Sequence, residues 1–175
     1  VVLIIGAGPI GIMHAKLAKM AGAAIVIIND LSSERLKACR AIDESFVTVG
    51  SEGLKAKVAE LTGGRGLDVC VTACPAPSAQ AESLELMAIF GRVCFFGGLA
   101  KDREIVPLNT NLIHYRQLTV TGSTRASVPQ FRKTLQFISS GRLSVKELIT
   151  GRFPLAGIAQ AIAQACRGEP AQVTE

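Results

Sequence analysis

The fold of this chain is decided by its first eleven residues, Val1-Val2-Leu3-Ile4-Ile5-Gly6-Ala7-Gly8-Pro9-Ile10-Gly11. An apolar run is followed by glycines in the pattern GxGxxG, and apolar residues at helical spacing come next. This order predicts a strand, a tight turn and a helix that begins with proline. Such a helix N-terminus is a place where a pyrophosphate can bind.

The three glycines of the turn have different steric roles. Gly6 permits the tight turn, Gly8 lets the backbone approach a bound phosphate, and Gly11 lets the helix pack close to the sheet. Because Pro9 has no amide hydrogen, we expect the amide of Ile10 to donate to the phosphate.

An acidic residue, Asp30, closes the next apolar run, 24 residues after Gly6. This is near the roughly 20 residues expected between the glycines and a ribose-binding acid. A carboxylate can accept from both ribose hydroxyls and would repel a 2′-phosphate. The sequence therefore predicts NAD rather than NADP.

Strands and helices alternate over the first part of the chain. Apolar runs predict six strands, at residues 1–5, 25–29, 46–49, 68–73, 92–96 and 117–121, and helical spacing predicts helices at 9–21, 33–42, 54–61 and 77–90. Nearly continuous apolar runs are typical of a parallel sheet covered on both faces, so we expect an α/β, doubly wound sheet with helices on both faces. Residues 125–175 predict a mainly helical appendage, with helices at 128–138 and 156–166 and a possible short strand near Leu148-Ile149.

Composition excludes several classes of protein. The net charge of +5 is spread along the chain without a basic block, which argues against nucleic acid as a partner, and no apolar run approaches the roughly 18 residues of a membrane span. The five cysteines, mostly within apolar runs, predict reduced core thiols and a cytoplasmic location. Neither histidine has metal-ligand spacing: His14 is expected to be an exposed helix residue and His114 a surface loop residue.

Several motifs occur together in a characteristic order: the glycine turn, Asp30, Thr62-Gly63-Gly64-Arg65-Gly66-Leu67-Asp68, Phe95-Phe96-Gly97-Gly98, Leu118-Thr119-Val120-Thr121-Gly122-Ser123 and Phe153-Pro154-Leu155. By these motifs, essentially the whole chain resembles the C-terminal part of the zinc-dependent medium-chain alcohol dehydrogenases, in particular the sorbitol, polyol, sugar and threonine dehydrogenase branch.

The resemblance implies a Rossmann domain at residues 1–124 that binds NAD(H), and a helical segment at residues 125–175 that packs against a catalytic lobe in the family. It also implies hydride transfer between NAD and the secondary alcohol of a polyol or sugar. The Gly-His-Glu segment of the zinc lobe is absent from this sequence. We therefore expect no metal ligands and no catalytic residues in this chain, and binding without turnover.

The resemblance also assigns residues around the cofactor. Arg35 matches a basic position beside the adenosine ribose, Arg125 matches a residue that reaches the cofactor in sorbitol-type relatives, and the nicotinamide end is implied near Cys74, Phe96, Gly98, Thr119 and Thr121. For Arg35 we favour cofactor contact over a solvated helix arginine, whereas Arg125 could equally be a surface arginine and Phe96 a core residue. Two positions depart from the family. Asp43 stands where a left-handed glycine is usual, and Gln172 stands where a basic residue often meets the pyrophosphate.

Two alternatives stay open at this point. The chain could come from a zinc-free, quinone-reductase-like enzyme that prefers NADP, although Asp30 argues against this. It could also be a Rossmann module that senses NAD or serves assembly without chemistry.

The family resemblance further implies a homodimer or tetramer formed near the sheet edge, at Arg103–Val106 and the strand after Gln117.

Overall fold

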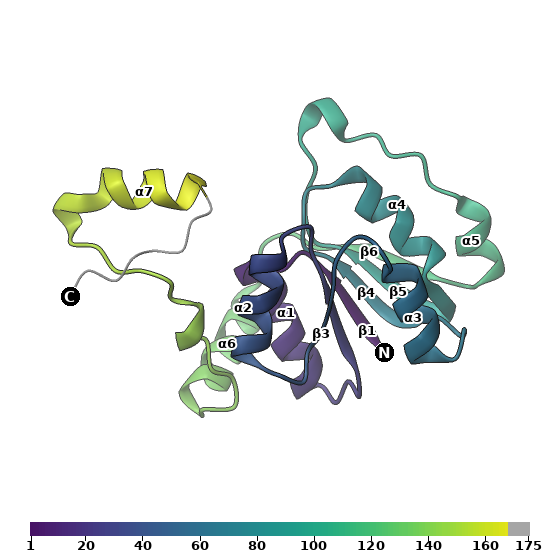
Figure 1. Cartoon of the computed structure of the whole chain (residues 1–175), viewed down its shortest axis with the longest axis horizontal. Coiled ribbons are helices and arrows are strands. Elements are labelled where there is room, and N and C mark those ends of the chain that lie inside the picture. The colour runs from purple at the N-terminus through teal and green to yellow at the C-terminus, as the bar shows by residue number, and fades with distance from the viewer. Residues whose placement is uncertain (168–175) are drawn as a thin grey trace.

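The computed structural model describes residues 1–167, which contain a six-stranded parallel sheet (Figure 1). The strands are β1 (Val2–Ile5), β2 (Val26–Asn29), β3 (Val47–Val49), β4 (Leu67–Thr72), β5 (Met87–Phe95) and β6 (Thr119–Gly122). They lie in the order β3-β2-β1-β4-β5-β6, with Ile4 of β1 opposite Ile28 on one side and Val71 on the other. The chain thus adds β2 and β3 on one side of β1, and then crosses to the other side of β1, where β4, β5 and β6 follow in order. This confirms the predicted doubly wound sheet.

Helices cover both faces of the sheet (Figure 1). They are α1 (Pro9–Met20), α2 (Ser33–Ile42), α3 (Leu54–Thr62), α4 (Pro77–Glu85) and α5 (Thr110–Tyr115). Successive strand residues point to opposite faces, so Ile4 and Ile28 pack with α1 and α2, whereas Leu3 and Ile27 pack with α3 and α4. Because both faces of the sheet are buried, apolar and polar residues do not alternate along the strands in the sequence.

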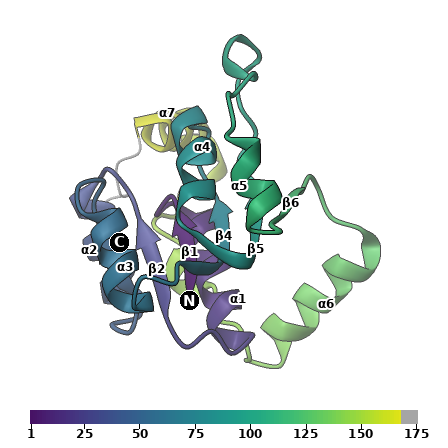
Figure 2. The same ribbon diagram turned by 90° about the vertical axis from the view of Figure 1, so that its right-hand side faces the viewer.

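Beyond β6 the chain forms helices that stand apart from the sheet. Figure 2 shows this for α6 (Val128–Ser139), which has no buried residue and begins with a capping box between Ser127 and Gln130. After the 3-10 turns η2 (Lys146–Leu148) and η3 (Leu155–Gly157) the chain ends its described part with α7 (Ile158–Arg167). The helical appendage is confirmed, but the possible strand near Leu148-Ile149 is wrong. An ion pair from Lys16 to Glu147 holds η2 against α1 instead.

The end of α4 differs from the sequence prediction, which continued this helix through Phe90. The helix stops at Glu85, and β5 begins at Met87. The guanidinium of Arg116 donates to the carbonyls of Leu84, Glu85 and Met87 at 3.5, 2.9 and 2.7 Å, which satisfies acceptors at the end of the helix. Phe90 has a left-handed φ of 62°, and its amide donates to the Arg116 carbonyl at 2.8 Å. A side chain distant in sequence therefore ends this helix.

Two smaller expectations are also wrong. His114 is exposed as expected, but it lies in α5 and not in a loop. Asp43 is extended, with a φ of −155°, and not left-handed. Its carboxylate accepts from Lys19 Nζ at 2.7 Å and from the Ser45 hydroxyl at 2.6 Å, and these hydrogen bonds lower the pKa of Asp43 to about 2. No helix within residues 1–167 is both long enough and apolar enough to cross a membrane.

Candidate functional site

The glycine turn between β1 and α1 is closely packed on one side and open on the other. Gly6 has a φ of 113°, which favours glycine, and its amide donates to the carbonyl of Asn29 at 2.7 Å. A Cβ atom on Gly11 would lie 1.8 Å from the carbonyl oxygen of Gly6, so α1 can begin this close to the turn only with glycine at that position. A Cβ atom on Gly8 would meet nothing within 4 Å. The open side of Gly8 and the first amides of α1 therefore form a cradle suited to a phosphate group.

Asp30 is fixed at the carboxyl end of β2, next to this turn. One of its oxygens accepts from the amide of Ala7 at 2.7 Å, and the other accepts from the amide of Ser32 at 2.8 Å. Its side chain is 11% exposed, and Arg35 Nη1 lies 3.9 Å from Oδ2. The carboxylate is thus held between the glycine turn and the start of α2.

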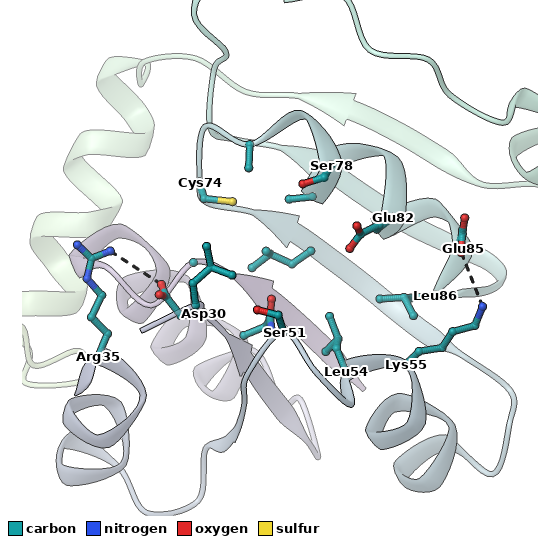
Figure 3. Close-up of a pocket in the computed structure, with 16 residues that line it drawn as sticks. Asp30, Arg35, Ser51, Leu54, Lys55, Cys74, Ser78, Glu82, Glu85 and Leu86 are labelled. Carbon is teal, nitrogen blue, oxygen red and sulfur yellow. Dashed lines mark ion pairs between the residues drawn. The ribbon is translucent and has the colours of Figure 1, made fainter. Parts of the chain in front are cut away.

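A cavity of about 480 Å³ opens beside Asp30 on the side of the sheet covered by α3 and α4 (Figure 3). Four residues of its wall were predicted from the sequence: Gly6, Asp30, Arg35 and Cys74. The sequence analysis missed the rest of the wall, which includes Ser51, Leu54, Lys55, Ser78, Ala79, Glu82, Glu85 and Leu86. Ser51 could have been found, because it follows β3 and ligands bind beyond the carboxyl ends of strands. The α4 residues carry no such signal.

The ends of β4 and β5 meet close to the glycine turn. The amide of Gly97 donates to the carbonyl of Thr72 at 2.7 Å, and a Cβ atom on Gly97 would lie 2.5 Å from the carbonyl oxygen of Cys74. Phe96 packs edge-on against His14 of α1, with ring centroids 4.5 Å apart. His14 is therefore half-buried, and the prediction that it is exposed was wrong. Burial lowers its pKa.

The other predicted residues lie outside the cavity wall. Gly8, Pro9, Ile10 and Gly11 form the start of α1, Gly98 follows β5, and Thr119 and Thr121 belong to β6. Thr121 Oγ1 donates to the carbonyl of Val93 at 3.3 Å. Arg125 follows β6 and is exposed, with a left-handed φ of 59°. Gln172 lies outside the described residues.

The cysteines are free thiols in a mostly buried setting. None of the five forms a disulfide. Burial raises the pKa of the Cys39 thiol to about 11 and also raises the pKa values of Cys70 and Cys74. Cys74 therefore lines the cavity as a protonated, weakly nucleophilic group at neutral pH. Within residues 1–167 no group of three or more His, Cys, Asp or Glu side chains could hold a metal ion.

Comparison with known proteins agrees with this geometry. Residues 9–140 match the family model described as zinc-binding dehydrogenase. The chain is 32% identical over 173 residues to L-threonine 3-dehydrogenase of Saccharopolyspora erythraea, a match covering 98% of this chain and 50% of that protein. It is 35% identical over 159 residues to sorbitol dehydrogenase of Bombyx mori, with 88% and 44% covered.

Solved structures show the same relationship. The structure of an alcohol dehydrogenase from Thermotoga maritima matches with a TM-score of 0.87 at 28% identity, covering 98% of this chain and 48% of that chain. This chain spans about half the length of these relatives. By sequence and by fold, the chain belongs to the zinc-binding dehydrogenase family.

Proposed function

We propose that this chain binds NAD(H) as the cofactor domain of a zinc-dependent alcohol, polyol or sugar dehydrogenase, which transfers hydride between a secondary alcohol and NAD. The observation that carries the proposal is the Asp30 carboxylate, fixed by the Ala7 and Ser32 amides between the glycine turn and the cavity. The names of its relatives, L-threonine 3-dehydrogenase and sorbitol dehydrogenase, support an alcohol as the substrate class.

The residues around the site have separate roles in this proposal. Gly6, Gly8, Gly11, Pro9 and Ile10 form the turn that receives the pyrophosphate, with the Ile10 amide as donor. Asp30 accepts from the ribose hydroxyls, and Arg35 lies beside the same sugar. The nicotinamide end lies near Cys74, Phe96, Gly98, Thr119, Thr121 and Arg125. When bound, the nicotinamide ring supplies the chemistry of hydride transfer, and the protein binds and orients it.

We further propose that this chain binds the cofactor without catalysing turnover by itself. Support comes from the family resemblance, which assigns the zinc ligands to a catalytic lobe and not to the NAD-binding domain. We assign cofactor binding to residues 1–124 and contact with a catalytic lobe to residues 125–175, as the family resemblance implies. The free thiols are consistent with a reducing cytoplasm.

Calorimetric titration of the chain with NAD and with NADP tests the proposal. We expect the unmodified chain to bind NAD more tightly than NADP, because Asp30 would repel a 2′-phosphate. Replacing this residue in Asp30→Ser should weaken NAD binding by about tenfold or more and remove the preference, since hydrogen bonds to a charged acceptor contribute roughly 1.5–3 kcal/mol. Asp102→Ser, at an exposed acid in η1 (Lys101–Arg103), is the control and should behave like the unmodified chain.

Three results would each contradict a part of this proposal. Unchanged cofactor selectivity in Asp30→Ser would mean that Asp30 does not bind the ribose. A preference for NADP in the unmodified chain would favour the quinone-reductase-like alternative instead. Oxidation of a polyol by the isolated chain with NAD would refute the expectation of binding without turnover.

A further inference from the structure

The position of the cofactor's base follows from the proposed function, on which this inference rests. If the pyrophosphate lies at the start of α1 and the ribose at Asp30, the base must continue beyond Asp30, away from the glycine turn. The cavity extends in that direction, between α3 and α4 (Figure 3). Its volume of about 480 Å³ leaves space beyond the ribose for a base.

The wall of this space is apolar at its floor and polar at its rim. Ile5, Leu54, Ala79 and Leu86 are buried side chains that belong to the core beneath it. The polar groups come from α3, α4 and the chain after β3: Ser51, Lys55, Ser78, Glu82 and Glu85. A flat apolar ring system on the floor would therefore direct its polar edge toward this rim.

The acidic groups of the cavity differ in whether they are already paired. Both oxygens of Asp30 accept from backbone amides, and Glu85 pairs with Lys55 at 3.7 Å. Glu82 has no hydrogen bond or ion pair with any other group in residues 1–167. In Figure 3 its carboxylate lies on the face of α4 that looks into the cavity, across from Ser51 and Leu54. Of the acids in the cavity wall, Glu82 is thus the one whose carboxylate is unpaired within residues 1–167 and available to a bound base.

We propose that Glu82 makes this site selective for adenine by accepting a hydrogen bond from the exocyclic amine of the base. Adenine carries an amine at its six-position, where hypoxanthine and guanine carry a carbonyl oxygen. A carboxylate accepts from the amine but repels the carbonyl oxygen. A site built to bond an N–H group rejects an analogue that lacks it, because the protein group is then left without a partner.

The test is a titration with NAD and with nicotinamide hypoxanthine dinucleotide, in which an oxygen replaces the six-amine and the adjacent N1 carries a proton. We expect the unmodified chain to bind NAD about tenfold more tightly than the hypoxanthine analogue. This is the lower end of the range for a hydrogen bond to a charged group, because the rim of the cavity is solvated. Glu82→Gln should reduce this preference to roughly twofold or less, since an amide can accept from the amine or donate to the carbonyl. The matched control is Glu60→Gln, at an exposed glutamate of α3 that does not line the cavity, and it should keep the full preference.

The outcomes separate this inference from the proposed function. If the unmodified chain binds neither dinucleotide, the proposed function is wrong and this inference falls with it. If it binds both equally well, or if Glu82→Gln keeps the preference, NAD binding stands and the role of Glu82 is overturned. Both glutamates are exposed, so thermal melting of the two variants should match the unmodified chain, and it checks that their folds are intact.

Discussion

Thr72 is a polar residue that, in the described part of the chain, is buried without a hydrogen-bond partner for its hydroxyl. It lies at the carboxyl end of β4 between Ile5 of β1 and Phe95 of β5, and it is fully buried. Among residues 1–167 its hydroxyl is the buried side-chain group without a hydrogen-bond partner. Burying a hydroxyl without a partner costs free energy, whereas a methyl group at the same place does not. The residue therefore lowers the stability of the fold.

Replacing the hydroxyl by a methyl group in Thr72→Val should raise the free energy of unfolding by about 1 kcal/mol. For a chain of this size the melting temperature should rise by roughly 2–4 °C. Thr119→Val, at an exposed position of β6, is the control and should change stability by less than about 0.5 kcal/mol. A lower melting temperature for Thr72→Val would mean that the hydroxyl has a partner in solution and would contradict the structure.

The glycine turn is the element that joins the fold to the proposed site. Its two outer glycines, Gly6 and Gly11, are required by packing, because a side chain on either would meet backbone atoms. Gly8, the middle one, faces open space and has an ordinary φ of −75°. Packing therefore does not explain glycine at this position, whereas close approach of a phosphate does.

This contrast predicts different results for two alanine variants. Gly11→Ala should destabilise the fold by about 2–4 kcal/mol, because its Cβ would overlap the Gly6 carbonyl and displace α1. Gly8→Ala should change stability by less than about 1 kcal/mol and yet weaken NAD binding at least about tenfold, since the methyl group would occupy the phosphate cradle. Chemical denaturation and calorimetry measure the two effects. Full NAD affinity in Gly8→Ala would argue against a phosphate at this turn.

Within residues 1–167 the sheet has two edge strands, β3 and β6. β6 is the outermost strand beside β5, and the chain before it carries Ile105, which is 90% exposed. The apolar side chains of α6 are exposed as well, among them Phe131 and Leu135. Exposed strand edges and apolar side chains favour association with another chain. We therefore expect homodimers or tetramers formed at this edge.

A charge at Ile105, in the exposed segment between η1 and α5, should weaken such an association. Ile105→Lys should raise the dimer dissociation constant by about tenfold or more, because the lysine would lose water on pairing. Leu155→Lys, at a similarly exposed leucine near α7, should leave it unchanged. Sedimentation velocity over a range of concentrations measures both variants. A chain that stays monomeric at high concentration would contradict the prediction.

Local signals were sufficient for the architecture of this protein. The apolar runs, the glycine turn and the Ser32 cap of α2 determine strands and helices whose ends agree closely with the structure for most elements. These features act through backbone geometry and side-chain periodicity, which are properties of a few neighbouring residues. Asp30 could be placed for the same reason, because its position depends only on the length of one strand–helix–strand unit.

Contacts between distant segments decided the rest. The Arg116 guanidinium ends α4 at Glu85, and Phe96 covers His14, yet neither contact is visible in the sequence around those residues. The far wall of the cavity, with Leu54 and Glu82, exists only because the ordered sheet brings α3 and α4 beside Asp30. The sequence by itself therefore determined the strand–turn–helix that can receive a phosphate. Only tertiary packing decided which side chains line the cavity beside Asp30, because it joins segments that local backbone preferences cannot relate.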